Sequence, residues 1–245
     1  MSELERIEKL EKEIRALKGL NFDGIPTYSF SKITMNILEK FLTVEKSINH
    51  SKFTKWFSFV YEVSNEDIDF FKRLIIENID LISDYNEEDL KVNMIIPILN
   101  RVKFKSFKNN FRAFYELPME YKTKKFIFNG TTDFLVSKGL IKSQKPYFFI
   151  QEFKKGRSNA DPEPQLLAEL ISAIELNNEN HIKGAYIIGA IWNFVVLEKI
   201  GKDKYQYFVS KNFDSTKIDD LQDIYKHLLF IKDEIIEKIR LERVE

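Results

Sequence analysis

The spacing of apolar residues predicts a helical first third of the chain, and it begins with an amphipathic helix over residues 3–18. Apolar residues recur there every three or four positions from Ile7 to Leu17, with Glu–Lys and Glu–Arg pairs four residues apart, and Gly19 is a stop signal. Two interpretations of this segment stay open. It is either a coiled-coil arm that joins two copies into a homodimer, or a helix packed on its own domain.

Helical spacing continues over residues 27–84 and again over 86–100. The second segment has Asn86 as a capping candidate ahead of three acidic residues, which suit the first turn of a helix. Pro97 lies inside this pattern and is expected to kink or shorten the helix. We therefore expect residues 1–85 to form an N-terminal helical region.

The period then changes to that of β-strands rich in Phe, Tyr, Ile and Val, which are interrupted and followed by amphipathic helices. The predicted strands are 111–118, 125–137, 146–154, 184–197 and 204–210, and the predicted helices are 163–177 and 216–243. This order indicates an α/β fold in which helices flank one mixed β-sheet. We expect residues 86–245 to form that domain.

Composition narrows the function classes. The chain has 245 residues, no cysteine and a formal net charge of zero, so thiolate chemistry is excluded and nucleic-acid binding would need local clusters of basic residues. The charged N-terminus lacks the apolar core of a signal peptide, and the longest apolar stretches are too short to cross a bilayer. We expect a soluble, cytoplasmic protein with no membrane partner.

The strongest chemical signal is Asp133, Glu152 and Lys154. Asp133 ends the sequence NGTTD, and Glu152 and Lys154 lie two apart in the apolar strand PYFFIQEFK, so both point to the same face. Two carboxylates can bind Mg²⁺ (or Mn²⁺), and a neighbouring ammonium group can orient water or stabilise charge on a phosphate. The alternative is a solvated strand end, but unpaired burial of charge on such a strand would be costly.

Further residues can complete this site. Glu87, at the start of its helix, is a candidate for the metal shell, with Glu88 as the alternative. The carbonyl of Phe153 can add a ligand, and Gly130 leaves room for close backbone approach.

The order of these motifs resembles the PD-(D/E)XK nuclease superfamily, and the likeness is greatest to the N-terminal nuclease domain of type I restriction R subunits and their small stand-alone relatives. It covers residues 86 to the C-terminus: NEEDLKVNMIIPIL with Glu87, GTTDF with Asp133, FIQEFKK with Glu152 and Lys154, and PEPQLLAEL with Gln165. The resemblance implies a restriction-endonuclease-like fold and Mg²⁺-dependent cleavage of DNA, in restriction, defence or DNA processing. It also implies that Gln165 supports the site.

Two departures from that family are visible. The acidic strand reads Thr-Thr-Asp where Pro-Asp is usual, and the chain has no G-x(4)-G-K-[ST] phosphate loop of the kind that the motors of R subunits carry. We therefore expect that the chain does not use ATP itself and that a partner motor or specificity subunit would have to be separate.

A basic strip follows the third predicted helix and is interleaved with aromatic residues. Its candidates for phosphate contact are Lys103, Lys105, Lys108 and Arg112, with Lys155 and Arg157 after the E-x-K strand. The alternative is a strand edge protected by lysines. Three functions thus remain: a nuclease, a catalytically silent DNA- or protein-binding module, and an assembly subunit. The choice between DNA and RNA is open.

Overall fold

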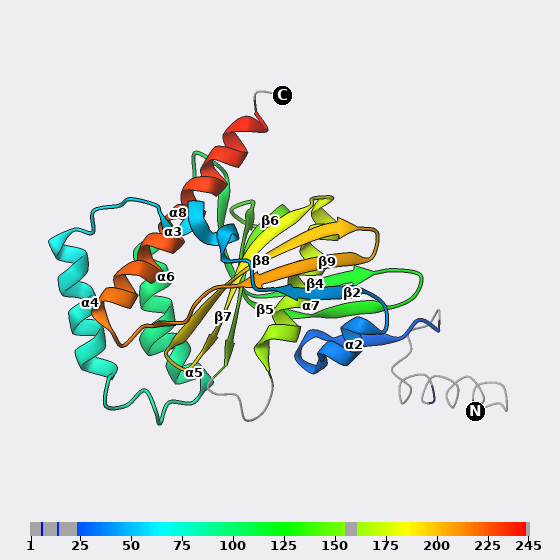
Figure 1. Ribbon diagram of the computed structural model, residues 1–245, viewed down its shortest axis with the longest axis horizontal. Helices are drawn as coiled ribbons and strands as arrows, with labels where there is room; N and C mark the ends of the chain where they lie inside the picture. Colours follow the sequence, from blue (N-terminus) through cyan, green and yellow to red (C-terminus); the bar gives the residue numbers. More distant parts are fainter. Residues whose placement is uncertain (1–5, 7–13, 15–23, 155–160, 244–245) are drawn as a thin grey trace.

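A mixed ten-stranded β-sheet organises the chain in the computed structural model, which describes residues 6, 14, 24–154 and 161–243 (Figure 1). Eight strands follow the order β2-β9-β8-β7-β6-β5-β4-β3, while β1 pairs with β5 and β10 with β8. The strands are β1 (Thr27–Ser29), β2 (Thr43–Ser47), β3 (Lys105–Ser106), β4 (Phe111–Lys122), β5 (Ile127–Lys138), β6 (Gln144–Lys154), β7 (His181–Ile188), β8 (Ile191–Gly201), β9 (Lys204–Val209) and β10 (Phe213–Asp214). The predicted α/β class with one mixed sheet is confirmed.

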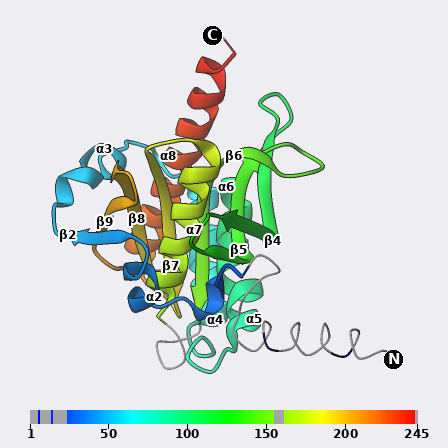
Figure 2. The same ribbon diagram turned by 90° about the vertical axis from the view of Figure 1, so that its right-hand side faces the viewer.

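Helices cover both faces of the sheet (Figure 2). One core contains α7 (Pro162–Asn177), α2 (Met35–Glu39) and the short turn η1 (Phe30–Lys32). The other contains side chains from η2 (His50–Phe53), α3 (Thr54–Phe57), α4 (Asn65–Asn78), α5 (Glu87–Leu90), η3 (Lys91–Ile95), α6 (Ile96–Val102) and α8 (Ile218–Leu241). The alternation of strand residues sets this division, since Phe149 and Phe153 of β6 face the α8 side and Ile150 faces α7.

The expectation that residues 27–84 are mainly helical is wrong at two places. Residues Thr27–Ser29 form β1, parallel to β5, and Thr43–Ser47 form β2, parallel to β9 at the edge of the sheet. Phe30 and Leu38 also lie in the same core as α7. The described part of residues 1–85 is therefore built into the sheet and its two cores. Of the arm expected at residues 3–18, only Arg6 and Ile14 are described, so that hypothesis lies outside the described residues.

The helix expected over 86–100 begins at Glu87 with a capping box and continues to Val102, but it contains a π-helical turn. The amide of Ile96 donates to the carbonyl of Lys91, five residues earlier, immediately before Pro97. Proline has no amide hydrogen and cannot continue the α-helical ladder, so the wider turn stands where a kink was expected.

The single strand predicted over 184–197 is wrong, because β7 ends at Ile188, the chain turns at Gly189 and Ala190, and β8 begins at Ile191 and pairs antiparallel with β7. The other predicted elements agree closely with the structure. β4 and β5 form an antiparallel hairpin, β6 lies between β5 and β7 in the sheet, and α8 is unbroken over Ile218–Leu241. Among the described residues, no helix is both long enough and apolar enough to cross a membrane.

Candidate functional site

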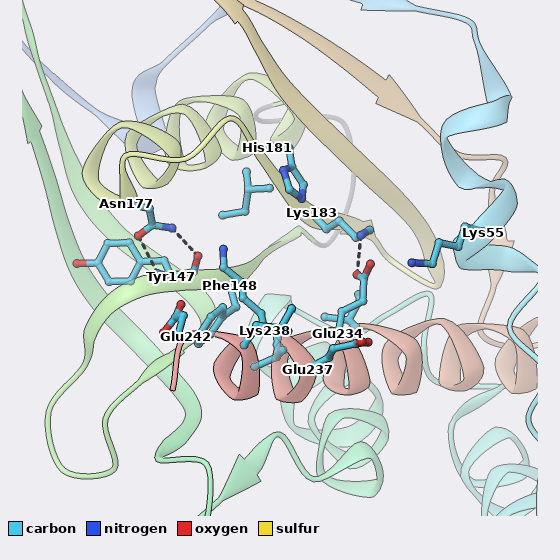
Figure 3. Close-up of a pocket in the computed structure, with 14 residues that line it drawn as sticks. Lys55, Tyr147, Phe148, Asn177, His181, Lys183, Glu234, Glu237, Lys238 and Glu242 are labelled. Atoms are coloured by element: carbon cyan, nitrogen blue, oxygen red, sulfur yellow. Dashed lines mark hydrogen bonds and ion pairs between the residues drawn. The ribbon is translucent and has the colours of Figure 1, made fainter. Parts of the chain in front are cut away.

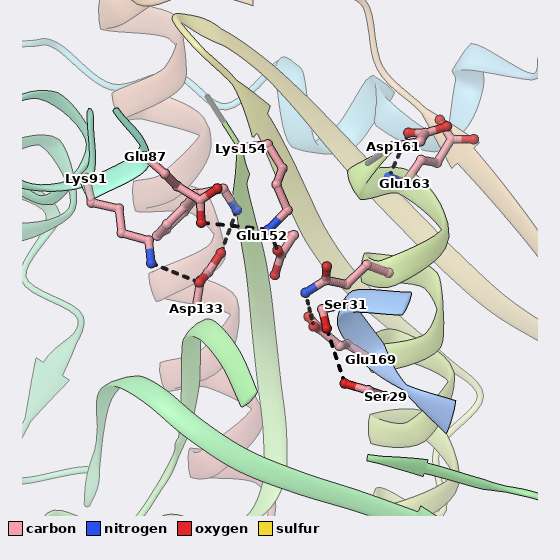
Figure 4. Close-up of polar contacts among 12 residues, drawn as sticks. Ser29, Ser31, Glu87, Lys91, Asp133, Glu152, Lys154, Asp161, Glu163 and Glu169 are labelled. Atoms are coloured by element: carbon pink, nitrogen blue, oxygen red, sulfur yellow. Dashed lines mark hydrogen bonds and ion pairs between the residues drawn. The ribbon is translucent and has the colours of Figure 1, made fainter. Parts of the chain in front are cut away.

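The site forms where strands β5 and β6 separate. Their antiparallel pairing ends at Phe134 and Gln151. Beyond this pair, the amide of Phe153 in β6 has no backbone partner on β5. The carboxylate of Asp133 replaces that partner, because its Oδ2 accepts a hydrogen bond of 2.8 Å from the amide of Phe153 (Figure 4). This contact fixes Asp133 beside the Glu152–Lys154 segment, and the structure thus brings the three predicted residues together.

Glu152 is the least typical side chain of the site. It is 1% exposed, and Lys154 Nζ lies 2.7 Å from its Oε1 as an ion pair. Among the described residues, however, neither carboxylate oxygen has a partner with acceptable hydrogen-bond geometry. Burial raises the pKa of Glu152 to about 8, the nearby Asp133 charge adds to the rise, and Lys154 opposes it. A bound cation would stabilise the ionised form of this buried carboxyl group.

Lys154 connects the strand to helix α5. Its Nζ lies 3.8 Å from Glu87 Oε1, in addition to the contact with Glu152. Burial lowers the pKa of Lys154, but Glu152 and then Glu87 outweigh burial, and the net shift is upward. Lys154 is therefore an ammonium group at neutral pH, which favours charge stabilisation or the orientation of water over proton abstraction.

The two acidic candidates on α5 reach different lysines. Glu87 lies beside Lys154, whereas Glu88 Oε2 is 3.9 Å from the Nζ of Lys91. Lys91 was not among the predicted site residues, because its position in an amphipathic helix is typical of a solvated lysine. It is nevertheless 8% exposed and donates to Asp133 Oδ1 at 3.0 Å.

Glu169 is a second functional candidate that the motifs missed. It is fully buried on α7, one turn after Gln165, whose Nε2 donates to its Oε1 at 3.2 Å. Burial first, and then the charge of Glu152, raise the pKa of Glu169 well above its usual range. A sequence signal existed, because a glutamate inside the apolar run LLAELISAI needs a partner or a purpose. Gln165, predicted to support the site, reaches Glu152 only through Glu169.

Carboxylates outnumber cations in this part of the described chain. Contacts and charge effects link two lysines, Lys91 and Lys154, with six carboxyl groups: Glu87, Glu88, Glu116, Asp133, Glu152 and Glu169.

Within the described residues, no three acidic or histidine side chains are placed together as a ready metal cage. Mg²⁺ does not require one, since it is usually bound by one or two carboxylates with water and substrate oxygens. The adjacent carboxylates of Glu152 and Asp133 fit that requirement, since the described residues offer Glu152 an ion pair with Lys154 but no hydrogen-bond partner.

Gly130 has a different role from the one expected. Its φ of +148° is rarely adopted by other residues, and a Cβ atom there would lie 2.9 Å from Cδ2 of Phe30. The glycine makes room for the core side chain of Phe30, where the close approach of a backbone segment was expected.

The basic strip is partly exposed. Lys103, Lys105 and Lys108 are exposed, and the first two line a hollow of about 530 Å³ with Arg112. The Arg112 guanidinium is already engaged, because it donates to the carbonyl of Leu140 at 2.7 Å and stacks on the ring of Phe114. The other two candidates, Lys155 and Arg157, lie outside the described residues.

A second cavity lies at the opposite end of β6, where the strand begins, and has a volume of about 350 Å³ (Figure 3). Tyr147 and Phe148 of β6 and helix α8 line it, and an ion pair of 2.5 Å joins Lys183 to Glu234 at its side. None of the predicted site residues that the structure describes lines this cavity.

Comparison with known proteins adds no assignment. The chain matches no protein-family model, and no curated protein has a significantly similar sequence.

Proposed function

We propose that the protein is a Mg²⁺-dependent endonuclease that hydrolyses DNA phosphodiester bonds, built on a restriction-endonuclease-like version of the α/β fold and acting in restriction, defence or DNA processing. One observation carries the proposal. Glu152 is buried beside Asp133 and Lys154 with oxygens that lack hydrogen-bond partners among the described residues. An arrangement that serves only stability would rarely bury a carboxyl group beside a second carboxylate, with one ion pair to Lys154 as its compensation.

Each residue of the site has a separate task in this proposal. Asp133 and Glu152 would hold Mg²⁺, which supplies activation of water and neutralisation of the phosphate when bound. The amide of Phe153 fixes Asp133 in the binding position. Lys154 keeps its proton and offers a positive charge to the phosphate, and Glu87 holds the ammonium group of Lys154 from the other side. The exposed lysines of the basic strip would contact the phosphate backbone.

Plasmid nicking with Mg²⁺ or Mn²⁺ tests the proposal. We expect Asp133→Ala, Glu152→Gln and Lys154→Met each to reduce cleavage by at least about a hundredfold while the fold is retained. Glu198→Gln is a matched control, because Glu198 is also a strand glutamate ion-paired to a lysine, at 2.7 Å from Lys52 of η2, and this variant should cleave at the wild-type rate. Full activity in all three site variants would exclude the assignment.

A catalytically silent module that binds DNA or protein is the second candidate. One observation favours it: Lys91 already neutralises Asp133 through an ion pair of 3.0 Å. This function predicts DNA retardation that depends on salt and not on Mg²⁺. It also predicts no plasmid nicking with any divalent metal.

A further inference from the structure

Lys91 is a buried cation bound to the residue that would hold the metal. Its Nζ lies 3.0 Å from Oδ1 of Asp133 and 3.1 Å from Oε1 of Glu116. The other oxygen of Asp133 accepts the Phe153 amide. The ammonium group therefore takes up the Asp133 oxygen that is not committed to the backbone, which is the one that a metal ion would use (Figure 4).

The backbone is irregular at both ends of this contact. Lys91 begins the π-helical turn of η3, a rare form of helix that is frequently found at functional sites. Glu116 has a φ of +50°, in the left-handed region, and it lies in β4 between the paired residues Tyr115 and Leu117, whose partners Phe134 and Thr132 flank Asp133. Such a conformation costs a non-glycine residue free energy and persists where the surroundings require it. Both irregularities thus occur at residues that take part in the same ammonium–carboxylate contact.

The second partner of Lys91 allows the ammonium group to leave Asp133 without losing all its contacts. The side chain of Glu116 is 62% exposed, whereas that of Asp133 is 11% exposed. Glu88, 75% exposed, lies 3.9 Å away from Lys91 as well. A displaced ammonium group would therefore keep carboxylate partners and gain access to water, which lowers the cost of displacement.

We propose that Lys91 is a positioning residue of the metal site: in the metal-free protein it neutralises Asp133 and holds this carboxylate in place, and it gives up Oδ1 when a divalent cation binds. The inference rests on the proposed metal-dependent function. Lys91 and the metal then compete for Asp133, so the charge of Lys91 weakens metal binding while it preserves the geometry of the empty site.

Direct binding of Mn²⁺, followed without DNA by the electron paramagnetic resonance signal of the free ion, tests the competition. Lys91→Met should bind Mn²⁺ roughly tenfold or more tightly than the wild type, because a charge 4–6 Å away changes cation affinity at a carboxylate by that order. Lys91→Arg should bind it more weakly, since a guanidinium group grips a carboxylate with two hydrogen bonds. Lys183→Met is the matched control, because its ion pair with Glu234 lines the distant cavity and its loss should leave Mn²⁺ affinity unchanged.

The outcomes separate the inference from the proposed function. If the wild type binds no Mn²⁺, the metal-dependent function itself fails. If the wild type binds Mn²⁺ but Lys91→Met binds it equally or more weakly, Lys91 has only a structural role and the inference is overturned. Should Lys91→Met fail to fold, Lys91→Arg decides alone, and an affinity equal to or above that of the wild type overturns the inference.

Discussion

Replacement of Glu152 by glutamine should make the metal-free protein more stable at alkaline pH. The pKa of Glu152 is about 8 in the folded protein, against 4.5 for an ordinary glutamate. Since the folded state holds this proton more tightly than the unfolded state, the contribution of Glu152 is fully present below pH 4.5 and is lost as the pH rises to 8. The difference corresponds to roughly 3–5 kcal/mol of unfolding free energy, at 1.36 kcal/mol per pH unit. The amide side chain of the Glu152→Gln variant has no such proton to lose.

Urea unfolding in EDTA at pH 5, 6, 7 and 8 measures this effect, with the fluorescence of the buried Trp56 and Trp192 as the signal. The two proteins should have similar stability at pH 5, and Glu152→Gln should exceed the wild type by several kcal/mol at pH 8. Titrating groups that do not interact with Glu152 cancel in the comparison, because both proteins share them. Glu198→Gln, which removes a more exposed ion-paired acid, should change stability by no more than about 1 kcal/mol at any of these pH values.

Parallel stability curves for wild type and Glu152→Gln would refute the reasoning, because they would show that Glu152 titrates normally in the folded protein. The same result would also weaken the proposal of a metal site, which depends on Glu152 being a buried acid with a raised pKa. A loss of stability in Glu152→Gln at pH 8 would be equally damaging, since it would mean that the ionised carboxylate is stabilised in place.

Three other predictions concern different parts of the molecule. Burial lowers the pKa of His227 to about 4, so stability should fall as the pH drops from 6.5 to 4, by about 3 kcal/mol. His227→Phe should abolish that loss in unfolding experiments at pH 7 and 4.5, and an unchanged loss would contradict burial as its cause. Gly130→Ala should lower stability by about 1–3 kcal/mol through strain against Phe30, with Mn²⁺ affinity unchanged, and a wild-type melting temperature would disprove the clash. Lys105→Ala should leave the melting temperature unchanged and lower the salt dependence of DNA binding by about one ion in retardation assays. Arg112→Ala should mainly lower the melting temperature. The reverse pattern would contradict the exposed position of Lys105 and the engaged guanidinium of Arg112.

Local patterns were sufficient for the elements that carry the E-x-K motif. The strands β4, β5 and β6 and helix α7 were predicted within a few residues, because long apolar runs with a consistent period have one favourable way to bury themselves. The strands β3 and β10, of two residues each, were not predicted, and the short strands β1 and β2 were also missed. Their sequences carry little periodic signal, and they become strands only by pairing with β5 and β9, which lie far along the chain.

The candidate site shows the same limit. The proximity of Asp133 to Glu152 was expected from adjacent strands, and the structure brings the two together through the Phe153 amide. Lys91 could not be identified, because its partner Asp133 is 42 residues away and its own surroundings resemble those of a surface lysine. Glu169 could have been identified, since a charge within an apolar helical face is visible in the sequence.

The order of residue types dictates which positions alternate as in a strand or recur with a helical period, and this determines the α/β class. It also places Glu152 and Lys154 on the same face of one strand and Asp133 on the strand before it. The depth at which those groups are buried, and the charges that face them, arise only when the chain has folded. Burial and charge pairing depend on atoms brought together from distant segments, and it is these that raise the pKa of Glu152 and bind Lys91 to Asp133. The residue types are encoded locally, whereas their electrostatic state is a property of the folded whole.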